Sequence, residues 1–321
     1  MKNSQPRVSI GMPVYNGEVY LKDALDSILM QTFSDFELII SDNGSTDQTA
    51  EICQAYAAKD QRIRYYRSEQ NLGAGWNFNR VVELATGEFF RWACHDDICA
   101  PKLLEECVQI LDAHPEVVLS YPQTLIINEH GQEVQKYFDG FDLRLAEPYK
   151  RFSQYLNLVR SGHGCHPIFG LIRLDTLQKT ARMGIYPSSD LVLLGELTLY
   201  GEFFEIPQYL FLKRDHPNTS VRAHRAFRNR IAWYDPTKKG KLHLTRWKWF
   251  TEYVSAIARS PISSGEKTRC YLLLSKWLRW NWVFLTKDLM KAITWPIVQP
   301  FISFELNKQV KKNSKTLSHS Q

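Results

Sequence analysis

The fold is decided by the stretch Phe36-Glu37-Leu38-Ile39-Ile40-Ser41-Asp42-Asn43-Gly44-Ser45-Thr46-Asp47. Its first five residues are mostly apolar, which favours a buried strand. The polar residues after them form a turn, in which Ser45 or Thr46 can cap the helix expected to follow. The apolar face of that helix includes Ile52, Ala55 and Tyr56. The stretch therefore predicts one strand–turn–helix unit.

The same unit recurs throughout the first hundred residues. The predicted strands are 8–12, 36–40, 63–67 and 88–94, and segments with apolar residues at helical spacing lie between them. Near-continuous apolar strands that alternate with helices are typical of a parallel sheet covered on both faces. We therefore expect an α/β fold with a Rossmann-like, mostly parallel central sheet flanked by helices.

Beyond residue 100 the pattern is less regular. A helix is expected at 101–113, and His130-Gly131 predicts a hairpin turn. The last hundred residues are predicted to be helical. The other expected elements are strands at 117–121, 125–128, 133–137, 169–173, 203–206 and 209–213, and helices at 152–159 and 191–199.

The composition is that of a globular protein, with 44% hydrophobic and 23% charged residues in a chain of 321. The six cysteines lack CxxC spacing, which disfavours a zinc site or a disulfide framework and favours a reducing compartment. Neither a signal peptide nor an apolar run of about 18 residues is recognised. We expect a cytoplasmic location, and association with the inner face of the membrane stays open.

Charge and tryptophan are distributed unevenly along the chain. Residues 225–321 hold 19 of the 40 Lys and Arg but 5 of the 34 Asp and Glu, a net charge of +14. The remaining 21 basic and 29 acidic residues give residues 1–224 a net charge of −8. Seven of the nine tryptophans also follow residue 224. This change predicts an α/β domain at 1–224, a basic, Trp-rich helical extension at 225–308 and a disordered tail at 309–321.

Four polar clusters follow predicted strands: Tyr15-Asn16, Asp42-Asn43, Asn71 to Gly73, and Asp96-Asp97. Loops at the carboxyl ends of parallel strands converge on one edge of the sheet, where ligands bind. The two adjacent carboxylates of the last cluster repel each other unless they are exposed or neutralised, and a divalent metal that carries phosphate would neutralise them. The alternative is a solvated turn in which these acids cap the next helix.

Several motifs follow one another in a specific order between residues 7 and 220. They are Val8-Ser9-Ile10-Gly11-Met12-Pro13-Val14-Tyr15-Asn16, Ser27-Ile28-Leu29-Met30-Gln31-Thr32-Phe33, the stretch 36–47 quoted above, Asn71-Leu72-Gly73, Ala85-Thr86-Gly87-Glu88 and Asp96-Asp97. In this order and spacing the sequence resembles the family 2 glycosyltransferases, which have the GT-A fold. The resemblance implies an inverting nucleotide-sugar transferase whose catalytic domain occupies residues 1–224.

The resemblance implies a binding site for a nucleotide-diphosphate sugar. Pro13, Tyr15 and Asp42 would hold the base and the ribose. Many relatives carry Arg where this chain has Phe78; either Arg80 or Arg67 takes over that role, or both are surface charges. The full set implied is Pro13, Tyr15, Asn16, Asp42, Asn71, Gly73, Arg80 and Asp96.

The resemblance also implies that Asp96 and Asp97 hold Mg²⁺ or Mn²⁺ against the diphosphate, which offsets the charge of the leaving group. The family often has a further acid where this chain has Cys94. His216 lies in a segment in which relatives place a residue that reaches the metal or the diphosphate, and it is either such a ligand or a loop histidine. His95 is likewise either a ligand or a packed side chain.

An inverting transferase needs a base that accepts the proton of the acceptor hydroxyl. The family's base precedes a helix near the end of the catalytic domain, and Asp190 occupies that place. The alternative role for Asp190 is the N-cap of the helix at 191–199. Glu196, in the middle of that helix, is interpreted as structural. The loop His163-Gly164-Cys165-His166-Pro167 is a candidate lining of the acceptor site.

Aromatic and basic side chains alternate over residues 245–295, as in Lys276-Trp277-Leu278-Arg279-Trp280-Asn281-Trp282. One interpretation is a helical appendage that packs its aromatics on the α/β domain. The other is an interfacial helix in peripheral contact with an anionic membrane, which would suit a lipid-linked acceptor. No nucleic-acid-binding motif accompanies these residues, so we expect no nucleic-acid partner.

The function predicted from these motifs is inverting transfer of a sugar to an acceptor hydroxyl, in the synthesis of a cell-surface glycan or polysaccharide. The acceptor would be a glycan or a lipid-linked sugar. A rival hypothesis is a non-catalytic nucleotide-sugar-binding or assembly protein of the same fold. A nucleotidyltransferase is disfavoured, because Pro13 to Gly17 is not a Gly-rich triphosphate loop. The chain has no GxGxxG, so nicotinamide binding has little support.

Overall fold

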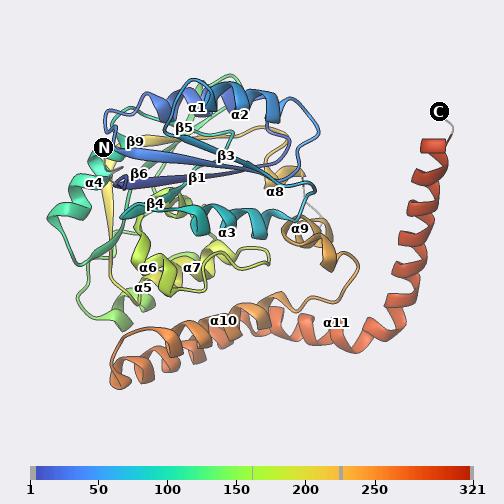
Figure 1. Cartoon of the computed structure of the whole chain (residues 1–321). Coiled ribbons are helices and arrows are strands. Elements are labelled where there is room, and N and C mark those ends of the chain that lie inside the picture. The colour runs from blue at the N-terminus through green and yellow to red at the C-terminus, as the bar shows by residue number, and fades with distance from the viewer. Residues whose placement is uncertain (1–4, 161, 224–226, 319–321) are drawn as a thin grey trace.

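The fold is organised around one sheet with the strand order β3-β2-β1-β4-β8-β6-β9-β5, and β7 pairs with β6 (Figure 1). The structure is a computed structural model that describes residues 5–160, 162–223 and 227–318. The first half of the sheet is parallel, with β1 between β2 and β4, and β2 beside β3. These strands are β1 (Val8–Val14), β2 (Phe36–Asp42), β3 (Ile63–Arg67) and β4 (Phe89–Trp92).

The second half of the sheet is mixed. Strands β6 and β9 are parallel to each other, whereas β8 pairs antiparallel with β4 and β6, and β5 pairs antiparallel with β9. The strands are β5 (Ile98–Cys99), β6 (Val117–Ile127), β7 (Glu133–Tyr137), β8 (Leu171–Arg173) and β9 (Glu202–Arg214). The separate strands expected at 117–121 and 125–128 form one strand, as do those at 203–206 and 209–213. Register shifts beside Pro122 let the pairing continue past that proline.

Helices cover both faces of the sheet (Figure 1). The strand period of two separates the cores: Ile10 and Met12 of β1 pack with α1 and α4, whereas Gly11 faces α3. A Cβ atom at Gly11 would lie 2.7 Å from Val81, so α3 rests directly on β1. One face carries α1 (Leu21–Leu29), α2 (Thr49–Ala57) and α4 (Leu103–Ala113); the other carries α3 (Ala74–Leu84), α6 (Leu174–Lys179) and α7 (Ser189–Leu197).

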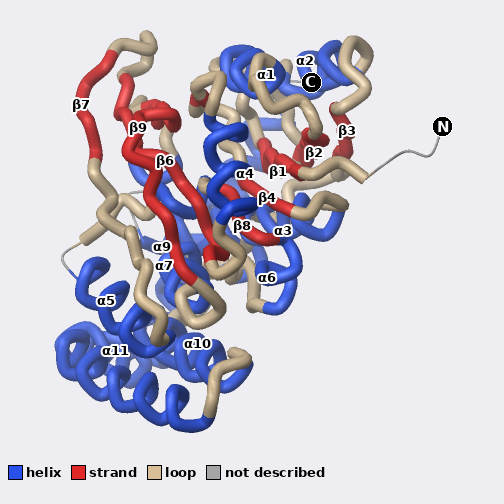
Figure 2. The backbone as a smooth tube through the Cα atoms, turned by 90° about the vertical axis from the view of Figure 1, so that its left-hand side faces the viewer, coloured by secondary structure: helices blue, strands red, loops and turns tan. Residues whose placement is uncertain are grey.

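The chain after β9 is helical. Helices α10 and α11 pack together beneath α5 and α7 (Figures 1 and 2), and Pro296 and Pro300 lie inside α11. Helix α11 is described as far as Ser318, and the disordered tail expected at 309–321 stays a prediction. The helices are α5 (Pro148–Arg160), α8 (Ser220–Ala223), α9 (Phe227–Tyr234), α10 (Thr245–Arg259) and α11 (Ser264–Ser318), and short 3-10 turns span His166–Phe169 (η1) and Pro236–Lys238 (η2).

The expected fold class is confirmed: a central sheet flanked by helices, with a helical C-terminal part. The division of the chain at residue 224 stays a prediction. All six cysteines are free thiols. Among the described helices, none combines the length and the apolar character needed to cross a membrane.

Candidate active site

The loops after β1 and β2 are tied to each other. The Asn16 backbone N–H donates to Ser45 Oγ at 2.9 Å, and Asn16 Oδ1 accepts from the Thr46 N–H at 2.9 Å. Asn16 has a positive φ of 51°, a conformation that asparagine tolerates better than most residues. These reciprocal bonds fix the Tyr15-Asn16 turn at the carboxyl end of the sheet.

A buried asparagine on α3 binds the backbone at the same edge of the sheet. Asn77 Nδ2 donates to the carbonyl of Ser41 at 2.9 Å and to that of Val14 at 3.3 Å, which joins the ends of β1 and β2. Asn43 Nδ2 donates to Asn71 Oδ1 at 3.0 Å, and this bond brings in the loop before α3. The polar clusters after three strands therefore form one connected edge, as the spacing of the motifs predicts.

This edge forms the floor of a cleft of ≈ 620 Å³, the main cleft. Six of the residues expected to bind donor or metal line it: Pro13, Tyr15, Asn16, Asn71, Asp96 and His216. A second wall comes from α9 and the segment after it, through Asn229, Trp233 and Lys239. The cleft thus draws side chains from both sides of residue 224.

Other expected donor residues lie outside the cleft lining. Asp42 is fully buried: its Oδ1 accepts from the Ser45 N–H at 2.8 Å and its Oδ2 from the Tyr65 hydroxyl at 2.8 Å. Gly73 lies beneath the segment that follows α9. Arg80 faces Glu83, with their charged atoms 3.6 Å apart.

Arg67 lies beside this buried acid. Its guanidinium donates to the carbonyl of Ser45 at 2.8 Å and lies 3.6 Å from the Asp42 carboxylate. Asp42 and Arg67 therefore support the loop after β2 in this structure.

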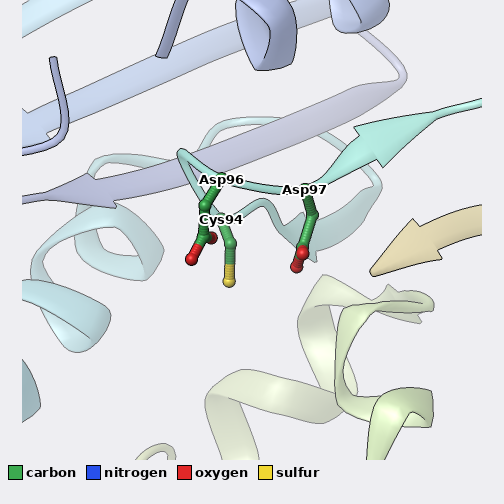
Figure 3. A group of neighbouring side chains, drawn as sticks. All are labelled: Cys94, Asp96 and Asp97. Carbon is green, nitrogen blue, oxygen red and sulfur yellow. The ribbon is translucent and has the colours of Figure 1, made fainter. Parts of the chain in front are cut away.

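The acid pair follows β4 and points to one side of its loop, together with Cys94 (Figure 3). The Cys94 sulfur, one carboxylate oxygen of Asp96 and one of Asp97 lie within 4.8 Å of one another. Asp96 lines the main cleft, and its Oδ2 lies 3.0 Å from His216 Nε2. Asp97 is buried, and its Oδ1 accepts from the Arg214 backbone N–H at 2.9 Å.

The two carboxyl groups have opposite electrostatic environments. Burial raises the pKa of Asp97, and the charge of Asp96 acts in the same direction. Burial also acts to raise the pKa of Asp96, but the hydrogen bond from His216 and the charges of His95 and His216 outweigh it, so that pKa is lowered. Two carboxyl groups this close, one buried and one at the cleft, repel each other when both are ionised, and a cation relieves that repulsion.

The donor set fits a hard divalent cation. Carboxylate oxygens are the ligands that Mg²⁺ and Mn²⁺ prefer. The thiol is a poor third ligand for such an ion, because burial and the charges of Asp97 and Asp96 raise the pKa of Cys94 well above its usual value and keep it protonated. Mg²⁺ or Mn²⁺ would therefore be held by Asp96 and Asp97.

The expected base lies in a cavity next to the main cleft. Asp190 lines a cavity of ≈ 180 Å³, the Asp190 cavity, which shares Phe78 and Trp233 with the main cleft. Asp190 Oδ1 is buried and has no hydrogen-bond partner among the described residues. Burial raises the pKa of Asp190. A carboxylate with a free oxygen and a raised pKa is suited to accept a proton.

The structure also brings Arg214 and Trp233 to this region, which the sequence did not single out, together with His95, which it did. Arg214 is buried at the end of β9 and donates to the carbonyls of Asp96 and Glu129 and to the carboxylate of Asp23, at 3.0 to 3.1 Å. His95 lines the main cleft with its ring packed over Gly17. Trp233 lies in the segment assigned to the extension, where no local motif marked it.

The candidate acceptor loop forms a separate buried cluster. His163 and His166 lie beside Asp139, with Nδ1 to carboxylate distances of 3.6 and 3.3 Å. Neither histidine lines the main cleft or the Asp190 cavity. The role of the loop 163–167 as a lining of the acceptor site stays a prediction.

A half-parallel sheet with polar loops and an acid pair at its carboxyl edge defines a protein of the GT-A fold. The sequence model of glycosyl transferase family 2 matches residues 9–180, more than half of the chain. The chain therefore belongs to family 2 of the glycosyltransferases, as its motifs predict.

Curated relatives agree with this assignment. An uncharacterised glycosyltransferase of Rickettsia prowazekii is 37% identical over 207 residues, which cover 64% of this chain and 61% of the relative. One from Methanocaldococcus jannaschii is 34% identical over 149 residues, 42% of this chain and 51% of the relative. The matches thus span less than two thirds of these relatives.

Solved structures agree in fold. TarS of S. aureus (residues 1–349) matches with a TM-score of 0.60 at 16% identity, over 98% of this chain and 92% of TarS. A mannosyltransferase of Pyrobaculum calidifontis, solved with GDP-Man and Mn²⁺, matches with a TM-score of 0.50 at 16% identity, over 91% of this chain and 88% of that one. TarS has also been solved with UDP-GlcNAc.

Proposed function

We propose that this glycosyltransferase inverts the anomeric centre while it moves a sugar from a nucleotide diphosphate to an acceptor hydroxyl. The observation that carries the proposal is the position of Asp190. Its carboxylate Oδ1 is buried without a hydrogen-bond partner among the described residues, in a cavity that shares the lining residues Phe78 and Trp233 with the main cleft. A base on one side of a donor cleft, opposite the leaving-group site, is the arrangement that a single displacement requires.

The donor would occupy the main cleft. Tyr15 offers an exposed ring for stacking on a base, and Asn16, Asn71 and Asp96 offer polar groups along the same wall. Similar folds in complex with UDP-GlcNAc and with GDP-Man support a nucleotide-diphosphate sugar as the donor.

In the reaction, Asp190 accepts the proton of the acceptor hydroxyl while that oxygen bonds to the anomeric carbon. The bond from the anomeric carbon to the phosphate oxygen breaks on the opposite side, and its electron pair leaves with the nucleoside diphosphate. A divalent cation bound at Asp96 and Asp97 would supply positive charge beside the diphosphate. We further propose that the acceptor is a cell-surface glycan or its lipid-linked precursor, and that the protein acts in the cytoplasm.

Replacement of Asp190 tests the mechanism. Asp190→Asn should lower the rate of sugar transfer about 10²- to 10⁴-fold, since general-base catalysis contributes this much. Donors are first identified by thermal shift across UDP-, GDP- and dTDP-sugars, and transfer is then followed as release of nucleoside diphosphate. A normally folded Asp190→Asn protein that transfers sugar at the wild-type rate would falsify the assignment.

We also propose that one face of α11 lies on an anionic membrane surface. Cys270, Leu274, Trp277 and Leu285 are buried against the protein, and the opposite face exposes a stripe of large apolar side chains. This outer face consists of Tyr271, Leu272, Trp282, Leu289, Met290, Ile293 and Ile297.

The net charge of this region supports an anionic membrane as the partner of α11. Residues 245–297 contain nine Lys or Arg and three Asp or Glu, a net charge of +6. Of the acids, Asp288 is buried beside Lys291 and Glu252 is paired with Lys248. An apolar stripe with basic surroundings is typical of helices that lie in the interface of an anionic bilayer.

Flotation with vesicles tests the membrane contact. The protein should float with vesicles that contain anionic lipid and less with neutral ones. Trp282→Ser with Ile293→Ser should abolish flotation, whereas Val134→Ser, an equally exposed apolar residue on β7, should not. If the double variant floats like wild type, or if the outer face instead joins two copies in sedimentation experiments, the membrane contact is wrong.

A further inference from the structure

A cavity of ≈ 310 Å³ lies between the start of α7, α9, α10 and α11. Four cationic side chains line it, Arg230, Arg246, Lys287 and Lys291, together with a single carboxylate, Asp288. We call it the basic cavity. Four positive groups and one negative group give its lining a net charge of +3.

The carboxylate does not neutralise this lining. Asp288 is buried, its Oδ2 accepts from the Arg246 backbone N–H at 2.9 Å, and its Oδ1 accepts from Lys291 Nζ at 2.8 Å. Asp288 therefore fixes the start of α10 against α11 and pairs with Lys291. The side chains of Arg230, Arg246 and Lys287 are left to interact with a ligand.

One of these cations has an unused donor, and a second lies against two aromatic rings. Arg230 Nε is buried without a hydrogen-bond partner among the described residues. The Arg246 guanidinium packs between the rings of Trp249 and Phe284, at 4.2 and 4.7 Å from their centroids. Burial lowers the pKa of Arg246. A buried guanidinium donor without an acceptor costs free energy, and two oxygens of a phosphate can accept from one guanidinium at once.

The basic cavity adjoins the proposed base. Ser188 and Arg230 line both this cavity and the Asp190 cavity. The three spaces form a series: the main cleft, the Asp190 cavity and the basic cavity. A molecule that extends from the basic cavity toward Asp190 would approach the main cleft through the Asp190 cavity.

We propose that the basic cavity is a subsite for a phosphate or diphosphate group of the acceptor. The anion, held by Arg230, Arg246 and Lys287, would anchor the acceptor with its hydroxyl toward Asp190. The acceptor role rests on the proposed function of Asp190, whereas the binding of phosphate by this cavity does not. The acceptor class is then a phosphate-bearing glycan carrier.

Binding of two probes tests the site, inorganic phosphate and a short-chain alkyl phosphate, with a neutral alkyl glucoside as reference. Calorimetry should show saturable binding of phosphate to wild type. Arg230→Gln and Lys287→Gln should each weaken it about tenfold, because each removes one charge-assisted hydrogen bond. Lys276→Gln, which removes an exposed charge elsewhere on α11, and Lys239→Gln in the main cleft should leave binding unchanged.

The arms of the experiment separate the outcomes. Tighter binding of the alkyl phosphate than of phosphate assigns the site to a lipid-borne group, and equal binding assigns it to the phosphate group alone. The proposal is overturned if neither probe binds saturably, if Arg230→Gln and Lys287→Gln bind like wild type, or if Lys239→Gln is the variant that loses binding. Loss of transfer in Asp190→Asn is measured separately, so either proposal can fail without the other.

Discussion

His216 Nε2 lies 3.0 Å from Asp96 Oδ2, although the two residues are 120 positions apart. The ring of His216 also contacts that of Tyr20, with centroids 4.7 Å apart. Because His216 and Asp96 line the main cleft, their contact joins the loop after β4 to the loop after β9 at the proposed cation site. His216 therefore orients a carboxylate that is proposed to bind the metal.

The first prediction concerns this orientation. His216→Gln should raise the Mn²⁺ concentration for half-maximal transfer about 10- to 100-fold, the usual effect of losing a group that orients a metal ligand. Transfer at saturating Mn²⁺ should recover most of the wild-type kcat. Asp96→Asn should lower kcat even at saturating metal. An unchanged Mn²⁺ dependence in His216→Gln would count against a role for His216 at the metal.

The second prediction is the acid limb of the pH profile. Burial raises the pKa of Asp190, so its carboxylate becomes protonated at a higher pH than an ordinary Asp, whose pKa is about 3.9. Transfer should be retained above the raised pKa and should decline as the pH falls through it. Asp190→Glu should keep an acid limb at a reduced rate, whereas the residual activity of Asp190→Asn should lack it.

A matched control separates this effect from general acid damage. Asp175→Asn changes an exposed carboxylate on α6 and should leave the profile unchanged. If Asp190→Asn keeps the wild-type acid limb, another group titrates there and Asp190 is not the base.

The third prediction concerns stability. Glu196 on α7 is buried, and both of its oxygens accept from Arg259 of α10, at 2.7 and 3.1 Å. Glu196→Gln should lower the free energy of unfolding by about 2 kcal/mol, less than for a fully buried pair because the Arg259 side chain is 34% exposed. Lys179→Gln, in the exposed pair with Asp175, should change it by less than about 0.5 kcal/mol. Urea denaturation measures both, and equal small losses would contradict the prediction.

Local patterns were sufficient to predict the parallel half of the sheet. Strands β1 to β4 are short apolar runs closed by polar turns, and such signals depend on neighbours in sequence. The convergence of Asn16, Asn71 and Asp96 follows from that topology alone. The sequence did not predict that the expected short strands merge into β6 and β9. Proline usually interrupts a strand, and only the pairing with β9 shows how Pro122 is accommodated within β6.

The rest of the site depends on long-range packing. The burial of Asp42 beneath the loop after β2 requires the hydroxyl of Tyr65 on the next strand. Trp233 and Lys239 reach the main cleft because the chain returns over α3 after β9, and nothing in their local sequence indicates this. The sequence after residue 225 suggests one uniformly charged extension, whereas the structure gathers Arg230, Arg246, Lys287 and Lys291 around the basic cavity.

The last prediction concerns the segment 227–239, which forms the second wall of the main cleft and is called its cover here. Gly73 has a φ of +93°, and a Cβ atom there would lie 2.5 Å from the Tyr234 carbonyl oxygen and 2.7 Å from Pro236. Gly73→Ala should therefore displace the segment 227–239, which carries Trp233, raise the KM for the donor several-fold and speed amide hydrogen exchange in that segment. Gly131→Ala is the matched control, because its φ is +80° but its nearest neighbour is 4.0 Å away. Both variants share the backbone strain, so only the clash at Gly73 can loosen the cover. Wild-type exchange over 227–239 in Gly73→Ala would mean that this segment does not depend on Gly73.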